Sequence, residues 1–193
     1  MSSEPRGRPR ASSREVLAEA ACELFLEQGY AATSVSDITR RTGVSRSSFF
    51  NYFLSKADVL WGGFDERVRE LATRLASPDP PGDIEGEIRA ALATMADGFA
   101  PDSLALALMN ARQMGLDDDL EREASVRQSR IARLVADRMR AAGVDDLRAA
   151  VLGSAYGGAV MAAVEEWARQ GPGRTVLREV LESALAVMDF RAQ

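Results

Sequence analysis

The sequence contains no histidine and only one cysteine among its 193 residues. Histidine triads, imidazole acid–base chemistry and histidine metal sites are therefore excluded, and one thiol cannot form a cysteine metal cluster. Cys22 cannot form an intramolecular disulfide, and its alanine-rich segment favours a buried structural thiol over a redox switch. The sequence also lacks a phosphate-binding glycine loop. We therefore expect no enzyme activity, no metal and no cofactor.

Long hydrophobic runs are also absent. No uninterrupted apolar segment approaches the ~18 residues that a membrane helix needs, and the first residues lack the apolar core of a signal peptide. No pattern typical of β-strands occurs beyond Gly82. These absences predict a cytoplasmic protein without membrane contact.

Lysine is nearly absent, and the charges are unevenly distributed. The formal net charge is -5, yet residues 1–56 carry +2 and residues 57–193 carry -7. The only lysine is Lys56. An acidic body discourages indiscriminate adsorption to nucleic acid and leaves the N-terminal segment as the attractive surface. The acidic run 117–119 is interpreted as a solvated helix start rather than a cation site.

Three helix-start signals occur within about two dozen residues. Ser34 is followed by Asp37, Ser45 comes soon after a glycine turn, and Ser55 is followed by Asp58. A preceding segment has apolar residues at helical spacing and ends near a glycine. The spacing predicts helices over about 35–42 and 45–52, which together with the preceding helix form a three-helix helix-turn-helix unit.

The outward positions of the third predicted helix are short and polar, which would let it approach the floor of a major groove. Arg46 can form a bidentate hydrogen bond with guanine, so it is the candidate for base readout. Phosphate contacts are expected from the hydroxyls of Thr33 and Tyr52 and from the Lys56 ammonium. The other candidate DNA contacts on this helix are Ser45, Ser47 and Ser48. The competing interpretation is a capped three-helix unit that only begins a helical bundle.

A basic segment, PRGRPR at residues 5–10, precedes this unit. It resembles the core of an AT-hook, an extended segment that enters the minor groove. Its candidate DNA contacts are Arg6, Arg8 and Arg10. The alternative is a solvated, disordered basic terminus.

The segment LFLEQGYAATSVSDITRRTGVSRSSFFNYFLSKADVL resembles the N-terminal signature of TetR-type transcriptional regulators, strongly so over residues 13–61. The resemblance implies a DNA-binding homodimer on a palindromic operator, usually a repressor released by a small ligand. It also implies Thr33 at the phosphate-facing start of the second helix, and base or backbone contacts by Arg46, Ser47, Ser48, Tyr52 and Lys56. Two features depart from the family pattern: Ser47-Ser48, and Phe50 where a phosphate-binding tyrosine is common.

The chain as a whole is expected to be all-α, with an N-terminal three-helix helix-turn-helix DNA-binding domain and a C-terminal helical regulatory and dimerisation domain. The predicted parts are a flexible basic arm (1–11), the DNA-binding domain (12–55), a connecting helix (56–77) and a ligand-binding and dimerisation domain (83–193). Helical stretches in the last part are expected near 83–99, 102–115, 118–142, 145–170 and 173–190.

Two apolar stripes near the C-terminus predict either a dimer surface or the core of one subunit, and the resemblance favours the dimer. The stripes are Leu152, Ala155, Ala159, Ala162, Ala163 and Glu166, and Leu177, Leu181, Ala184, Leu185 and Met188.

A small-molecule effector is expected in the C-terminal domain. Methionine and aromatic side chains favour adaptable apolar pockets, although each also suits an ordinary core. The candidate ligand contacts are Met95, Phe99, Met109, Asn110, Gln113, Tyr156 and Trp167. We therefore expect a homodimeric repressor that binds double-stranded DNA and a mostly apolar effector. The alternative is a helical ligand-binding or interaction protein whose head does not read DNA.

Overall fold

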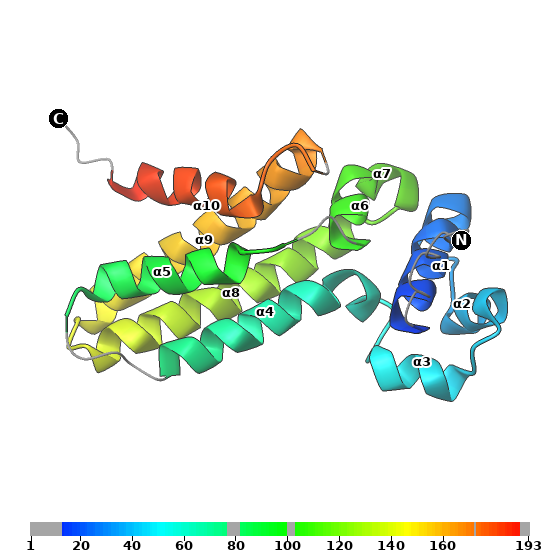
Figure 1. Cartoon of the computed structure of the whole chain (residues 1–193), viewed down its shortest axis with the longest axis horizontal. Helices are drawn as coiled ribbons and strands as arrows, with labels where there is room; N and C mark the ends of the chain where they lie inside the picture. The colour runs from blue at the N-terminus through cyan, green and yellow to red at the C-terminus, as the bar shows by residue number, and fades with distance from the viewer. Residues whose placement is uncertain (1–12, 77–81, 100–102, 172, 190–193) are drawn as a thin grey trace, which may run out of the picture.

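The computed structural model describes residues 13–76, 82–99, 103–171 and 173–189. Within these ranges every regular element is helical and no strand occurs, so the all-α prediction is confirmed (Figure 1). The predicted basic arm, residues 1–11, lies outside the described residues. The elements are α1 (Ser13–Gln28), α2 (Val35–Thr42), α3 (Arg46–Tyr52), α4 (Asp58–Ala76), α5 (Ile84–Ala96), α6 (Ser103–Met109), α7 (Ala111–Met114), α8 (Asp117–Ala141), α9 (Asp146–Gln170), α10 (Leu177–Ala186) and the short 3₁₀ helix η1 (Val187–Asp189).

Side-chain caps fix the starts of the short N-terminal helices. Ser34 and Asp37 form a reciprocal capping box, with the Asp37 amide 3.2 Å from Ser34 Oγ and the Ser34 amide 2.9 Å from Asp37 Oδ2. Gly43 ends α2 with a φ of 68°, a conformation that glycine adopts without a steric penalty. Ser45 Oγ then accepts the Ser48 amide at the start of α3. These caps make a tight turn between α2 and α3.

The predicted boundaries need two small corrections. Ser45 lies just before α3, where it is the N-cap residue. Lys56 lies just before α4, in the turn where Ser55 Oγ accepts the Asp58 amide at 3.2 Å. The single helix predicted over 102–115 is two helices, α6 and α7, which meet at Asn110. Helix breaks of this kind leave little trace in apolar periodicity.

The N-terminal helices α1, α2 and α3, called the head below, enclose a small apolar core. Large side chains from each of the three helices are buried in it, and Phe53 covers it from the turn that follows α3. Phe25, Ile38 and Phe49 are fully buried at its centre. Because so few side chains stabilise this unit, each contributes strongly, and truncating a buried phenylalanine costs about 3–5 kcal/mol.

The remaining helices, called the body, form a bundle in which α4, α5, α8 and α9 run roughly alongside one another and α10 packs on α9 (Figure 1). Glycines on α9 allow it to lie very close to α8. A Cβ at Gly153 would lie 2.4 Å from the Ala132 carbonyl oxygen, and one at Gly157 would lie 2.6 Å from that of Gln128. The apolar side chains along α4, from Leu60 to Leu75, are buried in the body as ordinary core.

The C-terminal stripes divide between core and surface. On α10, Leu177, Leu181 and Leu185 are buried within the same subunit, so they complete its core rather than form a dimer surface. On α9, Ala163 is also buried, whereas Ala155 remains exposed. Only the outer part of the predicted dimer surface is therefore available to a second subunit.

Helix α9 is also long and apolar enough, by length and composition alone, to cross a membrane, with a mean hydropathy of 1.4 over its most apolar 18 residues. This property is an average over the window and is not visible as an uninterrupted apolar run in the sequence. In the structure α9 packs between α8 and α10 and buries one face, as the core helix of a bundle does.

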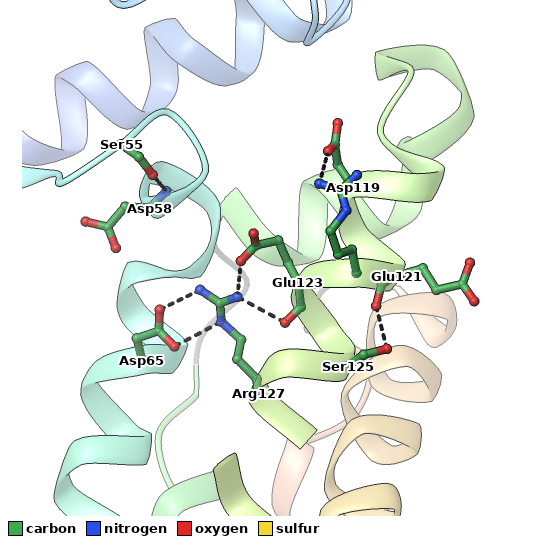
Figure 2. Close-up of polar contacts among 9 residues, drawn as sticks. Ser55, Asp58, Asp65, Asp119, Glu121, Glu123, Ser125 and Arg127 are labelled. Atoms are coloured by element: carbon green, nitrogen blue, oxygen red, sulfur yellow. Dashed lines mark hydrogen bonds and ion pairs between the residues drawn. The ribbon is translucent and has the colours of Figure 1, made fainter. Parts of the chain in front are cut away.

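Arg127 joins α8 to α4 (Figure 2). Its guanidinium donates to both carboxylate oxygens of Asp65, at 2.9 and 2.6 Å, and to the Glu123 carboxylate at 2.6 Å. It also lies 4.3 Å from the ring centroid of Trp61, and the residue is only 8% exposed. This buried, bidentate pair fixes α4 against α8 near the end of α4 that adjoins the head.

Replacing Arg127 by Ala should lower the free energy of unfolding by about 3–5 kcal/mol, because Asp65 would be left largely buried without a partner. Urea denaturation measures the loss. Arg133→Ala, an exposed arginine on the same helix, should change stability by less than about 0.5 kcal/mol. The double variant Arg127→Leu/Asp65→Leu should recover part of the loss, and equal stability of Arg127→Ala and wild type would contradict the assignment.

Candidate nucleic-acid interface

The exposed face of α3 presents the predicted reading residues. Ser45, Arg46, Ser47 and Tyr52 are exposed, and Ser48 is partly exposed. Because these side chains are mostly short, the helix axis can approach another surface closely, with Arg46 as the long cation among them. The Ser45 and Ser48 hydroxyls lie 2.8 Å apart, so both already take part in the cap.

Phe50 has a role that sequence reasoning missed. Its ring is 44% exposed, and the guanidinium carbon of Arg46 lies 5.7 Å from the ring centroid. A cation held over an aromatic face loses less freedom when it binds a partner. The i, i+4 spacing of Arg46 and Phe50 in the sequence indicates this contact, since residues at that spacing are neighbours on a helix surface.

Lys56 points into the head rather than only outward. Its ammonium donates to the Tyr30 carbonyl at 2.5 Å and to the Thr33 carbonyl at 2.8 Å, and it lies 3.9 Å from the Tyr30 ring centroid. Burial lowers the pKa of Lys56 from its ordinary value, while the charge of Asp119 acts in the opposite direction. Lys56 therefore holds the α1–α2 turn against the start of α4.

Thr33 was predicted to offer a hydroxyl to a phosphate, and the structure does not support that contact. The residue is 2% exposed, and its hydroxyl donates to the Gly29 carbonyl at 2.8 Å. The Gln28 side-chain amide donates to the Thr33 hydroxyl oxygen at 3.2 Å. Thr33 acts as an internal brace of the turn before α2, a role that its position at a helix start could not reveal.

The same turn is attached to the body. The Tyr30 amide donates to the Met114 carbonyl at the end of α7, at 2.7 Å. Burial, followed by the nearby charges of Asp119 and Glu123, raises the pKa of Tyr30 to about 12. The Tyr30 phenol therefore stays neutral at ordinary pH. The head thus meets the body through α4 and through this contact with α7, and α1 also packs against α6.

Two arginines of α2 flank the reading helix and were not predicted. Arg41 makes a bidentate pair with Glu27 of α1, at 2.7 and 2.6 Å, and this pairing raises its pKa further. Arg40 is mostly exposed and pairs with Asp37 on its own helix. Because exposed pairs of this kind are weak, the Arg40 guanidinium can exchange its partner for another anion.

The predicted ligand residues do not line one cavity. Phe99 and Trp167 pack edge to face at 5.2 Å in the buried core of the body, where Met95 and Tyr156 are also buried. Met109 is about half exposed on α6, nearer the head. The remaining candidates, on or next to α7, are Asn110 and Gln113. Apolar composition alone could not separate side chains that fill a core from those that border a space.

The head geometry, a capped tight turn followed by a short helix with an exposed polar face, defines a helix-turn-helix DNA-binding protein. Residues 17–60 match the family model described as bacterial regulatory proteins of the TetR family. The chain is 30% identical to the transcriptional regulator TcmR of Streptomyces glaucescens over 190 residues, which cover 93% of this chain and 84% of that protein.

Two further comparisons agree. The chain is 34% identical over 86 residues to MftR of Mycobacterium tuberculosis, covering 45% of this chain but only 43% of that protein. FadR of Thermus thermophilus, a TetR-family repressor solved in complex with lauroyl-CoA, is 26% identical and matches with a TM-score of 0.54 over 93% of this chain and 97% of that one.

The chain belongs to the TetR family of transcriptional regulators. Its all-α fold accordingly comprises an N-terminal helix-turn-helix domain and a helical C-terminal domain. Ligand-responsive regulation of transcription through DNA binding is the role of this family, and its members are regulators rather than enzymes.

Replacing Lys56 by Met should loosen the α1–α2 turn, because two carbonyls lose a charged donor worth about 1.5–3 kcal/mol for each hydrogen bond. Amide hydrogen exchange in residues 30–34 should accelerate at least roughly tenfold. Arg46→Met, an exposed arginine on α3 away from this turn, is the matched control and should leave exchange there unchanged. Unchanged protection in the Lys56 variant would show that the ammonium does not hold the turn.

Proposed function

We propose that this protein is a sequence-specific DNA-binding transcriptional regulator. It acts as a homodimeric repressor on a palindromic operator and is released by a small, mostly apolar effector. The observation that supports the proposal most directly is the exposed face of the capped helix α3, which presents Arg46 beside the serines Ser45, Ser47 and Ser48. Cytoplasmic localisation follows from this role.

The proposed contacts divide by chemistry. Arg46 reads a guanine in the major groove, with Phe50 limiting its orientations. The Tyr52 hydroxyl and the serines Ser45, Ser47 and Ser48 bind backbone phosphates or lie against base edges. Lys56 contributes mainly by holding the turn, with its remaining N–H directed to a phosphate. The arm residues Arg6, Arg8 and Arg10 enter the minor groove.

The proposed division of the chain follows these roles. Residues 1–11 are the basic arm, 12–55 the reading domain, 56–77 the connecting helix and 83–193 the effector and dimerisation domain. The connecting helix α4 supports this division because it packs in the body along its length and adjoins the head at its first turn.

The exposed face of α9 is the proposed dimer surface. Leu147 and Val151 are exposed, and Ala155 and Ala162 continue the same face at spacings of four and seven residues. An apolar stripe of this kind on the exposed face of a long helix suits an isologous contact with a second copy. A two-fold symmetric contact would place two heads on the two halves of a palindrome.

Replacing Val151 by Arg should convert the dimer into monomers, because the symmetric contact would bring two buried charges together. Analytical ultracentrifugation measures the mass. Val126→Arg is a closely matched control, because Val126 is also 59% exposed but lies on α8. A Val151 variant that remains as dimeric as wild type, with Val126→Arg behaving identically, would overturn this surface.

Selection of bound duplexes from a random pool, at physiological salt, tests the function itself. We expect a palindrome to be enriched. Arg46→Ala should then lose about 1–3 kcal/mol of specific binding and relax the preference at one base pair in each half-site. Arg40→Ala, a flanking cation, should weaken all duplexes alike. Absence of any enriched sequence would favour a helical interaction protein whose head does not read DNA.

A further inference from the structure

A cavity of about 550 Å³ lies at the end of the body remote from the head, where α4 and α8 end and α5 begins. This volume is within the usual range of small-molecule sites. Most of its lining is apolar, and much of it is alanine, which leaves room for a hydrocarbon. The principal apolar residues are Ala72, Leu75, Ala76, Ile84, Leu134 and Ala141.

One buried cation borders this apolar space. The Arg138 side chain is 9% exposed, and its Nε donates to Glu87 Oε1 at 2.7 Å while Nη2 donates to Glu87 Oε2. Both residues line the cavity. Among the described residues, Nη1 has no hydrogen-bond partner, and no buried side-chain polar atom is left unsatisfied. Nη1 is therefore accessible rather than buried, and the open space that Arg138 borders is this cavity.

The carboxylates at the cavity leave one part of the Arg138 guanidinium without a partner among the described residues. Asp137 also lines the cavity, but its side chain is 73% exposed and its carboxylate is paired with Arg140 at 2.7 Å. Glu87 occupies only one edge of the planar guanidinium. An arginine fork binds carboxylates in preference to neutral groups, and it binds them more strongly where water is excluded.

We infer that this cavity binds an apolar monocarboxylate and that this ligand is the effector. Its carboxylate accepts hydrogen bonds from Nη1 of Arg138 and competes with Glu87, while its hydrocarbon lies against the alanines. The regulatory part of this inference rests on the proposed function, whereas binding itself does not. Competition for Arg138 weakens the link between α5 and α8, and the ligand contacts the last turns of α4.

Calorimetry with three probes of one chain length tests the ligand class: decanoate, decanol and decyltrimethylammonium, all below their aggregation limits. Decanoate should bind the wild-type protein at least tenfold more tightly than the other two. Equal affinity for the three probes, or no binding of decanoate, would overturn the inference.

Three variants locate the site. Glu87→Gln should strengthen decanoate binding severalfold, because it removes the competing carboxylate and keeps the side-chain shape. Glu87→Gln/Arg138→Gln should abolish the preference for decanoate over decanol. Arg133→Gln, an exposed arginine on the same helix, should change neither. Circular dichroism confirms folding of each variant, and decanoate preference that survives the double variant would contradict the assignment.

Operator release is measured separately. Decanoate should displace the wild-type protein from the selected operator, and the double variant should resist it. Decanoate that binds as predicted but leaves the DNA complex intact would overturn the effector role. Because calorimetry needs no DNA, a failed operator selection would count against the proposed function alone.

Discussion

The bidentate pair between Arg127 and Asp65 fixes α8 against α4 within the body, and α4 is the helix that leads directly into the head. It fixes α8 to α4 about two turns from the start of α4, beside Trp61. The desolvation of such a pair is costly, so the pair stabilises the fold only when all of its hydrogen bonds are made. A contact of this kind is either formed or broken, with no intermediate state. Such a two-state contact suits a helix packing that couples a rearrangement of the body to the position of the head.

The head depends on a second, smaller set of contacts. Lys56 holds the carbonyls of Tyr30 and Thr33, and the Tyr30 amide in turn binds the end of α7. The turn before α2 is therefore braced from both sides. Helix α3 follows α2 through one tight glycine turn. The position of Arg46 on α3 therefore depends on the braced turn before α2.

The head was more predictable from the sequence than the body, for a physical reason. Caps such as Ser34 with Asp37 and a glycine with positive φ are local, so a few adjacent residues specify them. The inward contacts of Lys56 are with residues more than twenty positions away, and the Thr33 hydroxyl binds the end of α1 rather than its own helix start. The sequence pattern placed both side chains at the surface. Likewise, Leu181 and Phe99 have side chains suited to an interface or a pocket, and only packing shows that they fill the core.

We expect the Arg127–Asp65 pair to set the orientation of the reading head, because it fixes the helix that leads into the head. Pulsed electron spin resonance tests it within one subunit, with labels on cysteines at Ser47 of α3 and Arg133 of α8, in a Cys22→Ser background. Both label sites are exposed. The account predicts a narrow distance distribution that broadens or shifts when Asp65 is replaced by Asn, while α-helix content is unchanged. An identical distribution in the folded variant would show that the pair stabilises the body without positioning the head.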